Sequence, residues 1–354
     1  MNLTFVLQIL GVGFLALALS YLGVAVLRRW AERRQILDIP NERSLHTLPI
    51  PRGGGIAIVF FSLLGFIVIW QFNPIWPFSV FLTYLVGSLI IAGVSWLDDL
   101  RSLPNRIRFS AHTIVSLILL IGVGYWDVVN LPLVGQLHLG WVGVPITLLW
   151  ITGLTNAYNF MDGIDGIAGG QAVVAGLGWA VLGWLNHLPL ISTLGLLLAS
   201  CSLGFLGHNW PPARIFMGDV GSAFLGYTFA ILAVIAAQKD PRLALPGLLL
   251  VWPFIFDTTF TFLRRLRNGE NVFAAHRSHL YQRLVTAGYS HRFVTLLYIG
   301  LSGTGAILAL TWTLNLSGAT IIVTLSLPLL CLVLWAFVIR QERLRKYEIR
   351  KLRV

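Results

Sequence analysis

Apolar runs of membrane-spanning length follow one another along almost the whole chain, and few folds accommodate such a pattern. Eleven runs are close to the length, about 20 residues, at which a helix crosses about 30 Å of hydrocarbon. They cover approximately residues 3–27, 54–71, 78–97, 108–126, 141–158, 166–185, 188–207, 220–237, 243–263, 293–313 and 318–339. Hydrophobic residues make up 56% of the chain and charged residues only 11%, which leaves no soluble domain. We expect an all-α polytopic membrane protein, with residues 1–354 forming a single transmembrane domain.

The distribution of basic residues predicts how this bundle is oriented. An odd number of spans places the two termini on opposite sides of the membrane. Alternate connecting segments hold 23 of the 25 Lys and Arg residues, whereas the other side holds only Lys239 and Arg242. The positive-inside rule therefore places the N-terminus outside and the C-terminus in the cytoplasm. Topology accounts for the formal charge of +11, so we expect no nucleic-acid partner. The basic tail, residues 340–354, is expected to anchor this topology and to touch anionic membrane lipid.

The segment NAYNFMDGIDGIAGG, residues 156–170, is a polar island between two apolar runs. It contains Asn156, Asn159, Asp162 and Asp165 and no basic residue. An Asp at the centre of a membrane helix costs roughly 2.5 to 3.5 kcal/mol, so such residues usually mark a functional site. Capping of the following helix could explain one Asp but not the whole segment. We expect a ligand to supply the missing positive charge.

Three further acids fall on the same, cytoplasmic side. Asp98 and Asp99 are adjacent in SWLDDLR, and Asp219 lies between glycines in FMGDVGS. With Asp162 and Asp165 they give five carboxylates from three separate segments. Such oxygen ligands suit Mg²⁺ shared with phosphate, with Mn²⁺ as the alternative. Adjacent carboxylates repel each other, which makes one of the pair a candidate proton acceptor. Each acid, taken alone, is also compatible with a plain helix cap.

The segment AAHRSHLYQRL, residues 274–284, lies in the longest basic loop. His276 and His279 are three residues apart, so on a helix they would share a face with Arg283. Two histidines without a third ligand are a weak zinc signal. Arg277 and Arg283 point instead to phosphate, which Arg binds in a bidentate manner. A solvated cytoplasmic helix is the alternative interpretation.

A second basic segment, residues 41–55, contains His46 and Arg52 immediately before three glycines. It matches neither a Walker A loop nor a dinucleotide-binding fingerprint. Glycines allow the backbone to approach a ligand closely, so the segment is a candidate phosphate-binding loop beside Arg52.

Taken together, NAYNFMDGIDG, FMGDVGS, HRSH and the Asp98 and Asp99 pair resemble the motifs of the polyprenyl-phosphate N-acetylhexosamine-1-phosphate transferases, the glycosyltransferase 4 family. The resemblance covers about residues 40–285, and four motifs in the same order make it specific. It implies transfer of a sugar 1-phosphate from a UDP-N-acetyl sugar to undecaprenyl phosphate, with release of UMP and dependence on Mg²⁺. It also implies a multi-pass enzyme of the bacterial inner membrane with its site on the cytoplasmic face. The oligomeric state stays open, with a homodimer as one option.

The resemblance implies roles for individual residues. Asp219 matches the main Mg²⁺ ligand, with Asp165 as a second one. Asp98, supported by Asp99, matches the acid that assists attack by the lipid phosphate. The remaining matches bind nucleotide-sugar or phosphate, and they are Asn156, Asn159, Asp162, Asn209, Phe216, His276, Arg277, His279, His46 and Arg52. Within this set, Asn209 and Phe216 are expected at the uridine, and the two histidines of the HRSH segment at the diphosphate.

The HRSH segment also bears on the substrate. The phospho-N-acetylmuramoyl-pentapeptide transferases of peptidoglycan synthesis are expected to have three consecutive histidines there, which argues against that activity as the first choice. The segment looks closer to enzymes that initiate O-antigen, a lipopolysaccharide component, or another cell-surface polysaccharide. Their donors are UDP-GlcNAc, UDP-GalNAc, UDP-FucNAc or UDP-QuiNAc.

Two other classes of protein remain as alternatives. A transporter or lipid flippase would bind near the bilayer midplane between repeated halves, whereas these acids gather on one side. A non-catalytic scaffold would not explain five acids in glycine-bounded segments.

Overall fold

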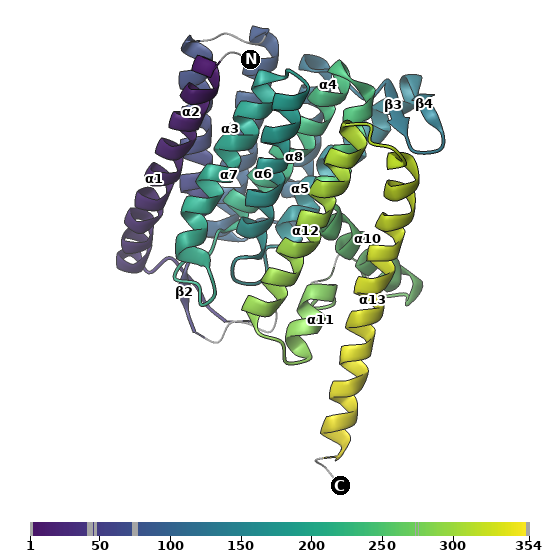
Figure 1. Cartoon of the computed structure of the whole chain (residues 1–354). Helices are drawn as coiled ribbons and strands as arrows, with labels where there is room; N and C mark the ends of the chain where they lie inside the picture. The colour runs from purple at the N-terminus through teal and green to yellow at the C-terminus, as the bar shows by residue number, and fades with distance from the viewer. Residues whose placement is uncertain are drawn as a thin grey trace.

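The computed structural model describes residues 3–40, 45, 48–72, 77–272, 274 and 276–351, which are mostly helical (Figure 1). The helices are α1 (Leu3–Arg34), α2 (Gly55–Phe72), α3 (Phe78–Arg101), α4 (Asn105–Gly122), α5 (Gly143–Phe160), α6 (Ile167–Leu185), α7 (Pro189–Asn209), α8 (Asp219–Lys239), α9 (Ala244–Leu250), α10 (Trp252–Arg267), α11 (Leu280–Thr286), α12 (His291–Thr313) and α13 (Ala319–Lys351). Short antiparallel pairs join β1 (Leu37–Asp38) to β2 (Ile50–Pro51) and β3 (Val128–Leu131) to β4 (Gly135–His138).

The long helices run side by side as a bundle, with the two chain termini at opposite ends (Figure 1). Among the described residues, eight helices are long and apolar enough to cross a membrane, or nine if α9 and α10 form one bent span. Helices α4 and α5, of 18 residues each, lie where two further spans were expected. The all-α polytopic membrane architecture is confirmed. The count of eleven spans and the orientation of the termini stay predictions.

The span expected over residues 243–263 contains a break. It is split into α9 and α10, whose axes are bent by 73°. Pro253 lies at the start of α10, and a proline there has no N–H to continue the hydrogen bonds of α9. The expected span is therefore broken in the middle, and the last turn of α10 contacts the segment that precedes α11 through Arg264 and Arg265.

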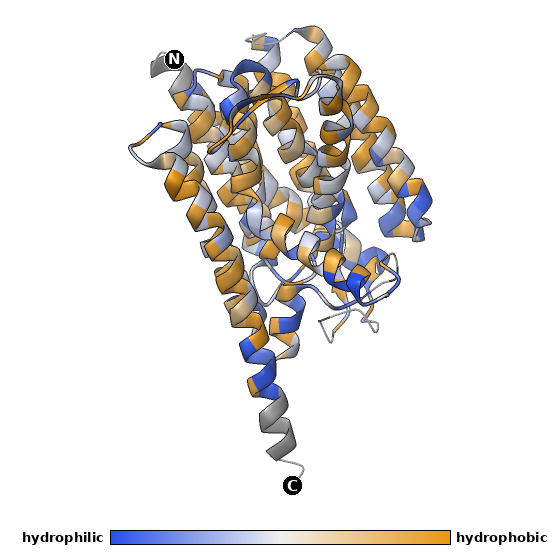
Figure 2. Cartoon of the chain, turned by 90° about the vertical axis from the view of Figure 1, so that its right-hand side faces the viewer, coloured by the Kyte–Doolittle hydropathy of each residue, from blue (hydrophilic) through white to orange (hydrophobic). Residues whose placement is uncertain are grey.

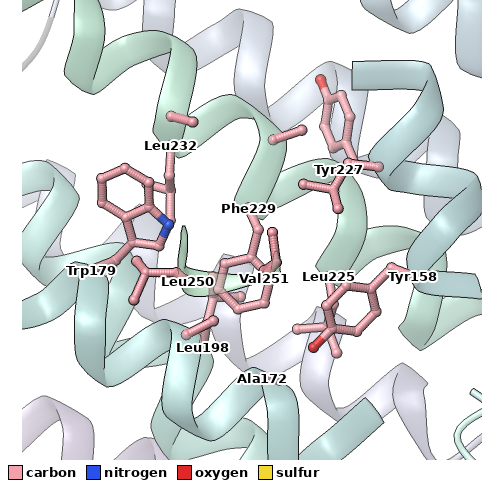
Figure 3. Close-up of a cluster of buried hydrophobic side chains, with 14 of the residues drawn as sticks. Tyr158, Ala172, Trp179, Leu198, Leu225, Tyr227, Phe229, Leu232, Leu250 and Val251 are labelled. Carbon is pink, nitrogen blue, oxygen red and sulfur yellow. The ribbon is translucent and has the colours of Figure 1, made fainter. Parts of the chain in front are cut away.

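Helix α8 is the centre of the bundle. Every residue from Val220 to Ala237 is buried inside the protein, because the helix is apolar on every face. Figure 3 shows part of this core, where Phe229 of α8 lies among Tyr158 of α5, Trp179 of α6 and Leu250 of α9. The first residue of α8, Asp219, is therefore held in place by close packing along the rest of the helix.

The outer helices present large apolar side chains to their surroundings, as expected of a surface that faces lipid tails. Phe14, Ile121 and Leu149 are exposed examples from α1, α4 and α5. Figure 2 shows apolar residues over most of the bundle and polar residues gathered toward the end where α13 protrudes. The helix α13 continues to Lys351, so most of the expected basic tail is the end of this helix.

Candidate functional site

The acidic residues singled out in the sequence meet at one end of the bundle. Asp98 and Asp99 lie in the last turn of α3, and Asp219 is the first residue of α8. Asn156 and Asn159 lie in the last turns of α5, immediately before the loop that carries Asp162. Helices α3 and α5 both pack against α8, which brings the three segments together.

The glycine-rich segment after β2 packs against the start of α8. The Gly54 and Gly55 N–H groups donate to the carbonyl oxygens of Phe216 and Met217, at 2.9 Å each. A Cβ atom on Gly55 would collide with the backbone of Gly221. These glycines therefore allow two backbone segments to pack together. Their role is thus structural, whereas the sequence suggested that they approach a phosphate.

This packing places the side chain of Arg52 at the site. Its Nη1 lies 3.8 Å from the Asp99 carboxylate, and the guanidinium keeps partial exposure to solvent. Arg52 thus stays a candidate phosphate contact. His46, its expected companion in the same loop, lies outside the described residues.

Asp99 caps the N-terminus of α8. Its carboxylate, only 2% exposed, accepts hydrogen bonds from the N–H groups of Asp219 at 3.1 Å and Val220 at 3.2 Å. A negative group at this position satisfies two free N–H groups and complements the helix dipole. Gly218 makes the close approach feasible, because a Cβ there would lie 2.7 Å from Asp99 Oδ2. The capping contact fixes where Asp219 stands.

Arg108, in the first turn of α4, joins two of the acids. Its Nη1 donates to Asp98 Oδ2 at 2.8 Å and to Asp219 Oδ2 at 3.2 Å. Asp98 also accepts from the Leu103 N–H at 2.5 Å, while Asn105 Oδ1 accepts from Arg108 Nη2. The sequence interpretation missed Arg108 as a site residue. Its position ten residues after Asp98, across a short turn between two helices, was the available signal.

Asp162 is the acid with the least compensation. Among the residues that the structure describes, none donates a hydrogen bond or forms an ion pair with its carboxylate. Burial, followed by the nearby carboxylates of Asp219 and Asp99, raises the pKa of Asp162 well above its usual range. The negative charge around Asp162 is thus not balanced by the described residues, and a bound cation would be stabilised there.

The chemistry of this cluster fits a magnesium ion. Four carboxylates, those of Asp98, Asp99, Asp162 and Asp219, are near two guanidinium groups, so negative charge is in excess. Over the described part of the chain, no three His, Cys, Asp or Glu side chains form a ready-made metal cage. Mg²⁺ commonly binds through one or two carboxylates and completes its shell with water and substrate phosphate. Asp219 and Asp162 are suitable donors for such an arrangement.

The two asparagines of the polar island stand beside these acids. Asn159 Nδ2 donates to Ser222 Oγ of α8 at 3.0 Å, and Asn156 Nδ2 donates to the Thr152 carbonyl at 2.7 Å. Both side chains are half-buried. Asn159 in particular ties the end of α5 to the first turn of α8, so it stands next to Asp219.

Asp165 and Asn209 have structural contacts. Asp165 accepts from the Ala213 N–H at 3.0 Å, and its other oxygen lies 3.4 Å from His291 Nδ1. A metal-binding role would require Asp165 to give up one of these contacts. Asn209, 3% exposed, accepts from the Gly166 N–H and donates to the Ile215 carbonyl. Its amide is thus already used to join two loops, whereas contact with uridine was expected.

Phe216 lies between these loops and the start of α8. Its N–H donates to the Pro51 carbonyl at 2.8 Å, and its side chain is half-buried. The backbone of Phe216 therefore has a clear structural role in pairing with β2 and with the glycines that follow it. Its expected contact with the uridine stays a prediction.

The histidine segment does not form the helix face that its spacing predicted. His279 is the N-cap of α11, and His276 lies in the preceding loop, where its Nδ1 contacts Ser278 Oγ at 2.8 Å. The two rings still meet, with centroids 5.0 Å apart. The shared helix face is absent because α11 begins only at Leu280, after both histidines.

The two arginines of the segment lie in different environments. Arg277 is exposed, as a phosphate contact would require. Arg283 is nearly buried, and its Nε donates to Glu342 of α13 at 2.6 Å while its Nη2 donates to the second carboxylate oxygen. Arg283 therefore joins α11 to α13, and the expectation that it binds phosphate was wrong.

The chain is similar to proteins of one family. Residues 81–237 match the family model described as glycosyl transferase family 4. A probable undecaprenyl-phosphate N-acetylglucosaminyl 1-phosphate transferase of Bacillus subtilis is 35% identical over 291 residues, which are 80% of each chain. A decaprenyl-phosphate N-acetylglucosaminephosphotransferase of Mycobacterium tuberculosis is 31% identical over 83% of this chain and 81% of its own length. A phospho-N-acetylmuramoyl-pentapeptide-transferase of a Synechococcus strain is 30% identical over 83% of this chain and 87% of its own.

Proposed function

The chain belongs to glycosyl transferase family 4, and we propose that it transfers N-acetylglucosamine 1-phosphate from UDP-GlcNAc to a polyprenyl phosphate, releasing UMP. The names of the Bacillus and Mycobacterium relatives support both the sugar and the kind of acceptor. The observation that carries the proposal is the gathering of Asp98, Asp99, Asp162 and Asp219 with Arg52 and Arg108 at one end of a membrane bundle.

In the proposed reaction, an oxygen of the lipid phosphate forms a bond to the β-phosphorus of the UDP-sugar. The bond from that phosphorus to the oxygen shared with the α-phosphate breaks, and the oxygen leaves with UMP. Both reactants are anionic, so positive groups must lower the repulsion between them. Arg52 and Arg108 are placed to do so, because each keeps about a quarter of its side chain exposed while bound to an acid.

The acids have separate parts in this proposal. Asp219 and Asp162 would hold Mg²⁺, which when bound supplies positive charge to the pyrophosphate. Asp99 keeps Asp219 in place through the N-terminus of α8. Asp98, paired with Arg108, stands beside this position and is the proposed acceptor of the proton of the lipid phosphate. Asp165 could join the metal only after releasing Ala213 or His291.

The place of the site within the membrane supports a headgroup reaction. The acids lie at helix ends, where a lipid phosphate resides, while the bundle behind them is apolar. We propose that this end faces the cytoplasm of a bacterial cell, that the acceptor is undecaprenyl phosphate, and that the product starts O-antigen or another surface polysaccharide. The distribution of basic residues supports the orientation.

The test is release of UMP by purified protein in detergent, with undecaprenyl phosphate, a divalent cation and a panel of UDP-sugars. The panel contains UDP-GlcNAc, UDP-GalNAc and UDP-MurNAc-pentapeptide, because one group of relatives is named for the last substrate. We expect release that requires lipid, Mg²⁺ and UDP-GlcNAc together. Release with the pentapeptide donor alone would assign the chain to peptidoglycan synthesis, and no release from folded protein with any donor would contradict the proposed transfer.

A further inference from the structure

Asp257 is a buried acid within α10 that the proposed reaction does not use. Its side chain is 0% exposed, yet five groups donate to it or lie within hydrogen-bonding distance. They are the N–H groups of Leu280 (2.7 Å) and Tyr281 (3.1 Å), the hydroxyls of Tyr298 (2.6 Å) and Thr261 (3.2 Å), and Nδ1 of His279 (3.2 Å). An acid inside a membrane protein is costly, so such a concentration of donors requires a reason.

The contacts join three helices at the beginning of α11. Asp257 from α10 binds the first two N–H groups of α11, and Tyr298 reaches it from α12. His279 is the residue just before α11, and its ring faces the same carboxylate. Because Oδ1 of Asp257 accepts from Nδ1, the ring orientation is set, and Nε2 is the ring nitrogen that has no hydrogen-bond partner among the described residues.

The beginning of α11 lies beside the polar island. The His279 and Phe160 rings have centroids 6.4 Å apart, and the Tyr281 hydroxyl donates to the Phe160 carbonyl at 3.1 Å. A side chain at Gly163 would collide with that hydroxyl, so the loop of Asp162 runs directly against α11. His279 therefore lies beside the end of α5, next to the loop that carries Asp162.

We propose that Asp257 is a positioning residue of the transfer site, which holds His279 so that its Nε2 binds the diphosphate of the nucleotide-sugar. The inference rests on the proposed function. A doubly protonated imidazole donates from both nitrogens, so the ring can donate from Nδ1 to Asp257 and from Nε2 to a phosphate oxygen. The other titratable groups beside the ring are His276 and Tyr281, and Tyr298 donates to the same Asp257 carboxylate. Asp257 touches no substrate, and its effect passes through His279.

A double-mutant cycle tests this coupling. The variants are Asp257→Asn, His279→Gln and the two combined, measured for UDP affinity by calorimetry and for kcat and KM with UDP-GlcNAc and with undecaprenyl phosphate. Loss of a hydrogen bond to a charged group predicts that Asp257→Asn weakens UDP binding by about 10- to 100-fold. It should raise the KM for UDP-GlcNAc and leave the KM for the lipid within about 3-fold, because only the former substrate meets His279. The double variant should be no worse than His279→Gln alone, within about 3-fold.

Tyr298→Phe is the matched control. It removes a hydrogen bond to the same carboxylate without changing the His279 contact. We expect both Tyr298→Phe and Asp257→Asn to lower the Tm, but only Asp257→Asn to weaken UDP binding. Equal weakening in the two variants would show that general destabilisation is responsible, which would overturn the inference.

The remaining outcomes separate this inference from the proposed function. Three results would each overturn the positioning role. They are a loss of UDP affinity in the double variant equal to the product of the two single losses, wild-type UDP affinity in Asp257→Asn, and failure of the wild-type protein to bind UDP. A wild-type protein that binds UDP but releases no UMP from any donor would contradict the proposed transfer. In that case the UDP affinities of the four proteins would still measure the coupling between Asp257 and His279. Should Asp257→Asn not fold, Asp257→Glu takes its place in the cycle, and a coupled loss of UDP affinity is again the expected result.

Discussion

Replacing Gly218 by Ala should disable the site while leaving the bundle intact. Gly218 precedes Asp219 and has φ 78° and ψ 165°, a backbone conformation that is essentially restricted to glycine. A Cβ there would also lie 2.7 Å from Asp99 Oδ2, and this carboxylate is buried and bound to two N–H groups. The added methyl group must therefore displace the cap of α8.

The size of the effect follows from two contributions. Forcing Ala into this conformation costs on the order of 1–3 kcal/mol. Loss of the cap adds about 1 kcal/mol. The combined cost is small enough for a folded protein, but a shift of about 1 Å in a reacting group lowers the rate on the order of 100-fold. We expect kcat/KM for UMP release to fall by about that factor.

The measurement is UMP release at matched concentrations of folded protein, with the Tm recorded in parallel. Gly300→Ala is the control, because a Cβ at this position in α12 meets no atom within 4 Å. It should keep wild-type activity and stability. Wild-type kcat/KM in Gly218→Ala would refute the claim that Asp99 and Gly218 together place Asp219.

Further changes test the remaining parts of the site. Asp219→Ala should leave a folded membrane protein with almost no UMP release, and wild-type turnover would exclude Asp219 as a metal ligand. Chelation by EDTA should abolish release from the wild-type protein, with recovery on adding Mg²⁺; activity that persists in EDTA would contradict the cation requirement. Arg108→Ala should lower kcat by about 100- to 1000-fold, the loss typical for a group that stabilises developing charge. Its control is the exposed Arg106→Ala, and equal losses in the two would point to a general charge effect. Glu342→Ala should lower stability by about 1–3 kcal/mol, because it leaves the nearly buried Arg283 without its bidentate partner; an unchanged Tm would show that the pair contributes nothing.

Several site residues were predictable because motif and topology agree. Asp98, Asp99 and Asp219 were expected on one side of the membrane, and the structure brings them together through the ends of α3 and α8. Asp162 was expected near the other acids, and the carboxylates of Asp219 and Asp99 lie close enough to raise its pKa. These predictions depend only on where each helix ends, which hydropathy indicates well.

Other residues were misjudged because their role depends on contacts between distant segments. The glycines after β2 look like a ligand loop in sequence, but they pack against α8. The sequence suggested Arg283 as a phosphate ligand, but in the structure it binds Glu342, which lies 59 residues later in the chain. Asp257 was not singled out, although an acid inside an apolar run was a usable signal.

The amino-acid sequence by itself determined the membrane-spanning helices, the side on which the acids gather and the family motifs. The hydrophobic effect acts on local stretches of chain, and each span is long enough to specify itself. Tertiary structure alone decided which polar groups meet. Asp99 meets the start of α8, Arg108 lies between Asp98 and Asp219, and Asp257 contacts Nδ1 of His279. A hydrogen bond depends on tenths of an ångström between helices that are far apart in sequence, and only the packed bundle sets those distances.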